Sequence, residues 1–133
     1  MTPALAASAS FLAFDFGLRR VGVAGGNTVT RTAQPLCTVA AEGDARFAAI
    51  AELVAEWQPA ALVVGVPFHP NGASHENTQR ARRFARQLRG RFGLEVHEID
   101  ERYTTTEAKA GGATDLDAAS AAIILEQFLG GIP

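Results

Sequence analysis

Blocks of hydrophobic and polar residues along the chain predict eight regular elements. Three short apolar runs, broken by glycine or proline, predict an antiparallel three-stranded meander at 11–16, 20–24 and 36–40. Apolar residues then recur at helical spacing in three segments, at 44–57, 74–91 and 117–129. Two further strands, at 61–66 and 94–99, lie between these helices. The order β-β-β-α-β-α-β-α predicts an α/β fold in which helices flank a mixed five-stranded sheet.

The length of 133 residues corresponds to one domain. We expect a flexible N-terminal tail at 1–10 and a single domain at 11–133. The run from Ala61 to Val66 is typical of a parallel strand that is buried on both faces. Asp44 is the expected N-cap of the first helix, and Thr104 with Glu107 predicts the capping box of an additional short helix.

Composition narrows the class of protein. Apolar residues make up 47% of the chain, enough for a packed core and too many for a disordered chain. The single cysteine, Cys37, allows neither an internal disulfide nor a cysteine-only metal site, and this fits a reducing cytoplasm. No run approaches the roughly 18 apolar residues of a membrane span, so no membrane association is expected.

Charge is distributed unevenly along the chain. The net charge of −2 argues against nucleic acid as a partner, yet six of the twelve basic residues lie between Arg80 and Arg91 with no acid among them. Within this run, Arg82, Arg86 and Arg89 recur at i, i+4 and i+7 and form one stripe. The stripe is either a solvated surface or a face that binds phosphates, and its spacing is compatible with both.

Three acidic positions carry the candidate chemistry. Asp15 lies inside an apolar strand, Asp100-Glu101 follows the last strand, and Asp117 begins the last helix. A buried carboxylate is costly unless it is paired or bound to a metal. Ligands of α/β sheets gather at the carboxyl ends of the strands, where Asp15 and Glu101 meet if their strands are parallel neighbours. Three carboxylates suit one or two Mg²⁺ or Mn²⁺ ions, which phosphodiester cleavage uses.

Helix capping and ion pairing compete with the metal-site interpretation of these acids. Asp117 is also a good N-cap residue, and Asp100 and Glu101 are able to pair with Arg102 and Arg20. Capping cannot explain an aspartate inside a strand, so Asp15 is the strongest of the three candidates.

Five motifs in order resemble the YqgF family, also called RuvX. They are the segments at 15–24 (DFGLRRVGVA), 32–36 (TAQPL), 63–72 (VVGVPFHPNG), 100–108 (DERYTTTEA) and 117–125 (DAASAAIIL). The resemblance implies an RNase H-like fold and a divalent-metal nuclease that trims the 5′ end of the small-subunit rRNA precursor. It carries the catalytic and metal-binding roles onto Asp15, Glu101 and Asp117. Asp100 is expected either to contact these ligands without binding the metal directly or to point away from them. Nucleic-acid binding is expected at Arg19, Arg20, Asn71, Arg82, Arg86, Arg89, Arg102, Thr104 and Thr105.

Two departures from the family pattern concern substrate binding. The central loop reads Pro67-Phe68-His69-Pro70 where the family usually has an asparagine, a methionine and an aspartate before the glycine, and the segment between Glu107 and Asp117 lacks the usual length and basic residues. Three hypotheses follow: an endonuclease that processes pre-16S rRNA, a Holliday junction resolvase acting on four-way DNA as a dimer, and a non-catalytic nucleic-acid-binding module. We expect structured RNA rather than a DNA junction as the partner, and a monomer or weak homodimer.

Overall fold

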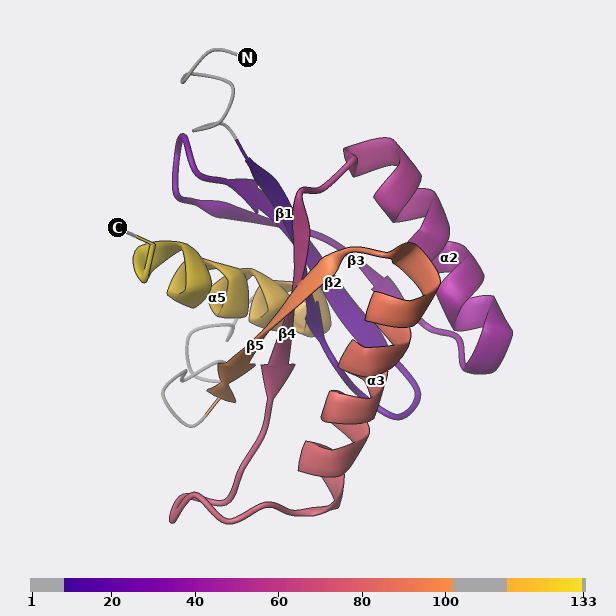
Figure 1. Ribbon diagram of the computed structural model, residues 1–133, viewed down its shortest axis with the longest axis vertical. Coiled ribbons are helices and arrows are strands. Elements are labelled where there is room, and N and C mark those ends of the chain that lie inside the picture. Colours follow the sequence, from indigo (N-terminus) through magenta and orange to yellow (C-terminus); the bar gives the residue numbers. More distant parts are fainter. Residues whose placement is uncertain (1–8, 102–114, 133) are drawn as a thin grey trace.

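The computed structural model describes residues 9–101 and 115–132, and within them all eight predicted elements form (Figure 1). Each boundary lies within three residues of its predicted position. The elements are β1 (Ser10–Asp15), β2 (Val21–Asn27), β3 (Ala33–Val39), α2 (Gly43–Trp57), β4 (Ala61–Val66), α3 (Glu76–Phe92), β5 (Glu95–Asp100) and α5 (Leu116–Gly130). The additional short helix predicted around Thr104 lies outside the described residues.

The five strands form one mixed sheet in the order β3-β2-β1-β4-β5. The meander is confirmed, because β1 pairs antiparallel with β2 and β2 with β3. The chain then crosses over through helices, so that β4 pairs parallel with β1 and β5 pairs parallel with β4. The three parallel strands β1, β4 and β5 therefore end at the same edge of the sheet.

Helices cover both faces of the sheet, with α5 on one side and α2 and α3 on the other (Figure 1). The larger core lies under α2 and α3 and includes Phe14, Ile50 and Phe84. The smaller core lies under α5, where Phe11 and Ala13 of β1 meet Ile124, Leu125 and Leu129 of the helix. Every residue of β4 is buried, as expected for a parallel strand covered on both faces.

Two helix starts differ from the prediction. The N-cap of α2 is Glu42 rather than Asp44, and Glu42 makes no capping hydrogen bond with its side chain. The helix α3 begins at Glu76, and its N-cap is His75, whose Nδ1 accepts a hydrogen bond from the backbone N–H of Asn77. Histidine is a rare N-cap, so its imidazole nitrogen replaces the usual hydroxyl or carboxylate acceptor in a way that sequence patterns do not indicate. Of the described helices, none has the length and hydropathy needed to cross a membrane.

Candidate active site

Asp15 is the last residue of β1, the central strand of the sheet. Because side chains alternate along a strand, it shares a face with Phe11 and Ala13, which pack under α5. The Asp15 side chain is only partly buried, since it lies where the strand ends and the core gives way to the sheet edge. The neighbouring strands place a glycine on each side of it, Gly22 in β2 and Gly65 in β4.

Glu101 follows β5 directly but reaches Asp15 across an intervening strand. The strands that carry the two acids are parallel but are not direct neighbours, because β4 lies between β1 and β5. At this level of the sheet β4 carries Gly65, and a Cβ atom there would lie 2.6 Å from Oε1 of Glu101 and 2.5 Å from Cδ1 of Ile124. The missing side chain of Gly65 is therefore what allows the Glu101 carboxyl group to approach Asp15.

Asp15 and Glu101 form a hydrogen-bonded pair of carboxyl groups. Burial raises the pKa of Asp15 from its ordinary 3.8 to about 6, while the hydrogen bond from Glu101 opposes the shift. Burial also raises the pKa of Glu101 from 4.5 to about 8, and the charge of Asp15 and their hydrogen bond add to it. The two carboxyl groups therefore titrate as a pair, and burial and their hydrogen bond make the pair hold a proton more tightly than separate, exposed carboxyl groups would.

Asp117 lies in the first turn of α5, beside the same end of β1. The N-cap of α5 is Asp115, which accepts hydrogen bonds from the backbone N–H of Ala118 and, at 2.6 Å, from the Thr38 hydroxyl. These bonds hold the pKa of Asp115 below its ordinary value. Asp115, and not Asp117, is therefore the N-cap of α5.

A second glycine brings Asp117 to the sheet. A Cβ atom on Gly22 would lie 1.8 Å from the backbone oxygen of Asp117, so only glycine lets the first turn of α5 rest on β2. The charge of Asp117 contributes to the raised pKa of Asp15, which places the two carboxylates within electrostatic reach. The Asp117 side chain also pairs with Arg20, with Nε to Oδ2 at 3.3 Å.

The site has the donor chemistry for a hard divalent cation. Its side chains offer only carboxylate oxygens, which Mg²⁺ and Mn²⁺ prefer. Among the described residues, no three acidic, histidine or cysteine side chains are grouped closely enough to hold an ion. Glu101 is hydrogen-bonded to Asp15, and Asp117 is paired with Arg20. To share an ion, the three carboxylates would require Arg20 to release Asp117 and the hydrogen bond between Asp15 and Glu101 to open.

The exposed residues Arg19 and Arg20 follow Asp15 in the β1–β2 loop, beside the acids. Sequence reasoning missed a third arginine that contacts this loop, Arg46 of α2, which is only 6% exposed. It bonds the backbone oxygens of Gly17 and Leu18. The signal was present in the helical pattern, since Arg46 stands one turn before Ile50 on the apolar face of α2.

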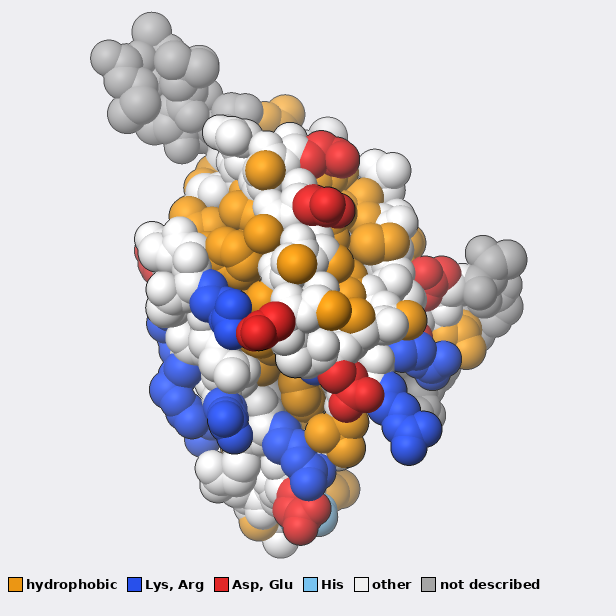
Figure 2. Space-filling view, turned by 90° about the vertical axis from the view of Figure 1, so that its right-hand side faces the viewer, with side chains coloured by type: hydrophobic (Ala, Val, Ile, Leu, Met, Phe, Trp, Pro, Cys, Tyr) orange, Lys and Arg blue, Asp and Glu red, His pale blue; other side chains and the backbone are white. Residues whose placement is uncertain are grey.

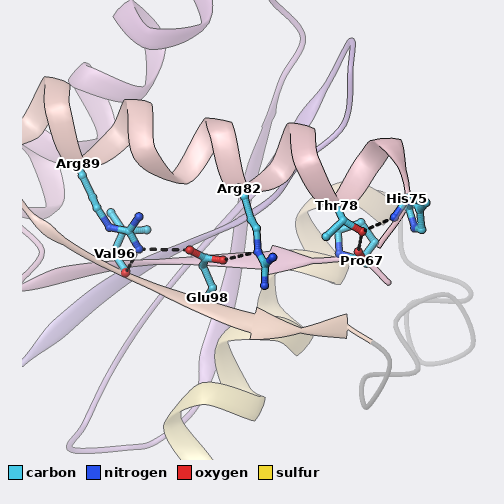
Figure 3. A network of polar contacts seen from close by, with 7 residues as sticks. All are labelled: Pro67, His75, Thr78, Arg82, Arg89, Val96 and Glu98. Atoms are coloured by element: carbon cyan, nitrogen blue, oxygen red, sulfur yellow. Dashed lines mark hydrogen bonds and ion pairs between the residues drawn. The ribbon is translucent and has the colours of Figure 1, made fainter. Parts of the chain in front are cut away.

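The arginine stripe of α3 lies beside β5 and is partly neutralised there (Figure 3). Arg82 and Arg89 both form ion pairs with Glu98, each at 3.3 Å, and Arg89 also donates to the backbone oxygen of Val96. Arg86 is exposed, and no ion pair joins it to any residue within the described segments. Figure 2, which looks onto the side carrying α2 and α3, shows Lys and Arg side chains grouped over its lower half.

The remaining candidate residues are spread around this edge. Asn71 lies in the β4–α3 loop and accepts a hydrogen bond from the backbone of Ala73. Asp100 ends β5, and its charge adds to the raised pKa of Glu101. Arg102, Thr104 and Thr105 lie outside the described residues. His97 pairs with Glu95 and stacks on Phe128, so its contacts are structural.

The mixed five-stranded sheet, with carboxylates at the end of its central strand, defines an α/β protein of RNase H-like fold. Two solved structures share it: RuvC from Thermus thermophilus in complex with a Holliday junction substrate (TM-score 0.59, 14% identity, covering 91% of this chain and 93% of that one), and Archaeoglobus fulgidus Pelota (TM-score 0.52, 9% identity, covering 92% and 34%). At these identities the likeness concerns the fold alone.

The chain belongs to the RuvX family. The family model described as "RuvX: Holliday junction resolvase" matches residues 9–131. A protein of Polaromonas sp., provisionally named as a pre-16S rRNA nuclease, is 70% identical over 124 residues, which cover 93% of this chain and 90% of the relative. A protein of the same name from Burkholderia pseudomallei is 52% identical over 140 aligned positions, covering 100% and 96%. The family resemblance is thus confirmed, and with it membership in an enzyme class, the phosphodiester hydrolases.

Proposed function

We propose that this chain is a divalent-metal-dependent endonuclease that processes the 5′ end of pre-16S rRNA. The observation that carries the proposal is the hydrogen-bonded carboxyl pair of Asp15 and Glu101 at the end of the central strand. Two glycines of the neighbouring strands give Glu101 and Asp117 access to Asp15. Such crowding of acids serves no purpose in packing and is costly for stability, so its use lies in chemistry.

Asp15, Glu101 and Asp117 are the residues that would hold the metal. When bound, such an ion lowers the pKa of water and stabilises charge on the phosphate oxygens. Glu101 would have to give up its proton for both carboxylates of the pair to serve as ligands. Arg20 would then have to release Asp117, and with Arg19 it would be available to bind a phosphate of the substrate.

The RNA substrate is supported by the relatives, whose names designate pre-16S rRNA nucleases. Polar contact with the nucleic acid is assigned to the β1–β2 loop and to Arg82, Arg86 and Arg89 of α3, with Asn71, Arg102, Thr104 and Thr105 as further contacts. Monomeric or weakly dimeric behaviour is proposed with it, in the cytoplasm, where the precursor is processed.

A second candidate, resolution of four-way DNA junctions, is favoured by the description of the family model. It requires two active sites held at a fixed spacing by a dimer. A non-catalytic binding module is the third hypothesis, and the carboxyl pair disfavours it because binding phosphates requires no acids.

One experiment separates the three functions. The purified protein is incubated with a pre-16S rRNA fragment containing the 5′ processing site and, in parallel, with a four-way DNA junction, each with Mg²⁺, with Mn²⁺ and with EDTA. We expect metal-dependent cleavage of the RNA, and none by Asp15→Asn protein. Cleavage of the junction alone would favour the resolvase, and binding without cleavage of either substrate would favour the module.

A further inference from the structure

Arg46 is a buried arginine, and within the described segments no ion pair joins it to a carboxylate. Its side chain lies under the β1–β2 loop, and its guanidinium donates to three backbone oxygens: Ala41 at 2.8 Å through Nε, and Gly17 at 3.0 Å and Leu18 at 2.9 Å through one terminal nitrogen. The charge of Glu42 acts on the guanidinium from the start of the same helix, but these hydrogen bonds of Arg46 all go to backbone oxygens. Burying a charge in this way is costly, and apolar residues of similar volume often replace a buried charge without loss of stability, so Arg46 is a candidate for a role beyond packing.

The contacts of Arg46 converge on the segment that follows Asp15. Its guanidinium stacks on the Phe16 ring, 5.5 Å from the centroid, and Phe16 also contacts Phe84, whose ring centroid lies 5.2 Å away. The loop is tight as well, because a Cβ atom on Gly17 would lie 2.5 Å from the backbone oxygen of Arg20. The loop backbone is thus held by Arg46 on one side and packed closely against itself on the other.

The fixed backbone determines what the loop presents to solvent. With the oxygens of Gly17 and Leu18 directed toward Arg46, the side chains of Leu18, Arg19 and Arg20 are all exposed. Arg20 is 65% exposed even while it contacts Asp117. Two adjacent arginines held outward beside the acids suit phosphate binding, since a loop that is already fixed loses less conformational freedom when a ligand binds.

We propose that Arg46 is a positioning residue for substrate binding, which holds the β1–β2 loop so that Arg19 and Arg20 meet the substrate phosphates next to Asp15. The inference rests on the proposed function, because it takes a nucleic acid as the ligand. Arg46 itself touches no substrate, so its loss acts entirely through the loop. Lysine cannot replace it, because one compact ammonium cannot span the Ala41 oxygen and the two loop oxygens together.

The test uses Arg46→Lys, which keeps the net charge, and Arg91→Lys as the matched control. Arg91 also stacks on a phenylalanine, Phe47 at 4.1 Å, but it lies at the far end of α3 and outside the set proposed to bind. Binding to a fluorescent RNA duplex of generic sequence is measured in the Asp15→Asn background at several salt concentrations. We expect Arg46→Lys to raise Kd about tenfold and to flatten the log–log salt slope by about one to two units, as for one or two lost phosphate contacts. Arg91→Lys should match the parent.

A double-mutant cycle distinguishes positioning from general loss of structure. In an Arg19→Gln/Arg20→Gln background, Arg46→Lys should change Kd by less than about twofold, because the groups it positions are gone. In the cleavage-competent protein it should raise KM and leave kcat nearly unchanged. Full additivity in the cycle, or an unchanged Kd and salt slope in Arg46→Lys, would overturn the proposal.

A second variant keeps the proposal testable if Arg46→Lys does not fold. Gly17→Ala disturbs the same loop from its other side while it leaves Arg46 in place, and it should produce the same loss of affinity and the same flattened slope. A normal Kd in Gly17→Ala would count against the loop as the binding element. Because binding is measured without cleavage, a failure of the nuclease proposal leaves these measurements intact, and the two failures are distinguishable.

Discussion

The acidic end of the sheet and the arginine helix α3 both gather like charges, and the fold treats them differently. At the acidic end, Asp15 and Glu101 are brought into contact under α5 and share a proton. Along α3 the arginines stay at the surface, and four of the six find a carboxylate: Arg80 with Glu76, Arg82 and Arg89 with Glu98, and Arg91 with Asp44. The acids are concentrated against their own repulsion, whereas the bases are dispersed and neutralised.

This difference indicates where the protein commits free energy to function. Forcing two carboxyl groups together in a partly buried site destabilises the fold, and exposed ion pairs contribute about 0–1 kcal/mol each. The acidic end is therefore specified by several residues at once, including Gly22 and Gly65, where a Cβ atom would clash with the elements that carry the acids. The arginine helix depends on no such arrangement, and single changes there should have smaller effects.

Replacing Asp15 should have the largest effect of any single change. Asp15→Asn keeps the size of the side chain but removes the charge that binds the metal, and we expect cleavage of the pre-16S fragment to fall by about 10³-fold, equivalent to roughly 4 kcal/mol. The matched control is Asp44→Asn, an aspartate whose side chain is 98% exposed on α2. Cleavage rates at saturating Mg²⁺ measure both. Equal activity of the two variants would remove Asp15 from the active site.

The second-largest loss of activity is expected from a change at Gly65, the β4 glycine that lies between Asp15 and Glu101. In Gly65→Ala the new methyl group meets the movable ends of Ile124 and Glu101 rather than backbone, so we expect the protein to fold with a loss of about 1–2 kcal/mol. Cleavage should fall by about 10²-fold, because the methyl group pushes the Glu101 carboxyl group away from Asp15, and a misplacement of about 1 Å is enough for such a loss. Denaturant unfolding and cleavage rates are measured on the same preparation.

Gly90→Ala is the control for the glycine prediction. Gly90 lies in α3, and a Cβ atom there would meet nothing within 4 Å beyond its own helix, so alanine should stabilise the helix by about 0.5–1 kcal/mol and leave cleavage unchanged. If Gly65→Ala lost stability and activity in the same proportion, its effect would be on folding alone, and Glu101 would have no separate role.

The sequence was sufficient for the fold because its elements are locally consistent. The run at 61–66 could only be a strand buried on both faces, and Phe11, Ala13 and Asp15 had to share a face once the strand was assigned. The three acids were predicted for the same reason, since strand ends and a helix start were known. The order of the strands within the sheet could not be predicted from the sequence. Only the structure shows that β4 lies between Asp15 and Glu101, and that a glycine at position 65 is needed for Glu101 to approach Asp15.

The patterns of apolar and charged residues also could not predict side-chain contacts between elements that are distant in the sequence. The stripe of Arg82, Arg86 and Arg89 was identified from helical spacing, but its contact with Glu98 depends on α3 packing beside β5. Asp117 and Asp115 are both acidic residues near the start of α5, and only the hydrogen bonds of Asp115 with Ala118 and Thr38 distinguish the N-cap from the candidate site residue. Arg46 was missed because a buried arginine has the spacing of a core residue.

The shared proton predicts an unusual dependence of stability on pH. The pKa values of Asp15 and Glu101 are raised in the folded state, so the folded protein binds protons more tightly than the unfolded chain. Their contribution to stability is fully present below about pH 4 and is lost as pH rises through about 6 and about 8. In EDTA, Tm should therefore fall by several degrees between about pH 5 and about pH 9. Asp115 acts in the opposite direction, but only at lower pH.

Two measurements isolate the pair. In Glu101→Gln the side chain has no titrating proton, so the Tm of this variant should vary much less over the same pH range. Millimolar Mg²⁺ or Mn²⁺ should raise the Tm of the wild-type protein, and the increase should grow with pH because the ions bind the deprotonated acids. A metal-induced increase that did not depend on pH, or that persisted in Asp15→Asn, would place the ion elsewhere.

The smallest expected effect is on RNA binding, and it distinguishes the α3 arginines that have an ion-pair partner from those that have none among the residues described. Arg83 and Arg86 are exposed and have no ion-pair partner among the residues described, whereas Arg82 and Arg89 share Glu98. A phosphate competes with Glu98 for Arg82 and Arg89 but meets Arg83 and Arg86 without competition. Arg83→Gln/Arg86→Gln should therefore weaken binding of an RNA duplex several-fold and flatten the salt slope by about one to two units.

Arg82→Gln/Arg89→Gln carries the same change in charge and should flatten the slope by less, because Glu98 already neutralises part of that charge. It should instead lower stability by up to about 1 kcal/mol, through the loss of contacts between α3 and β5. Salt titrations of both double variants, with unfolding curves beside them, make the comparison. Equal slopes in both variants and the wild type would mean that α3 is a solvated surface, and that the β1–β2 loop provides the contacts with nucleic acid.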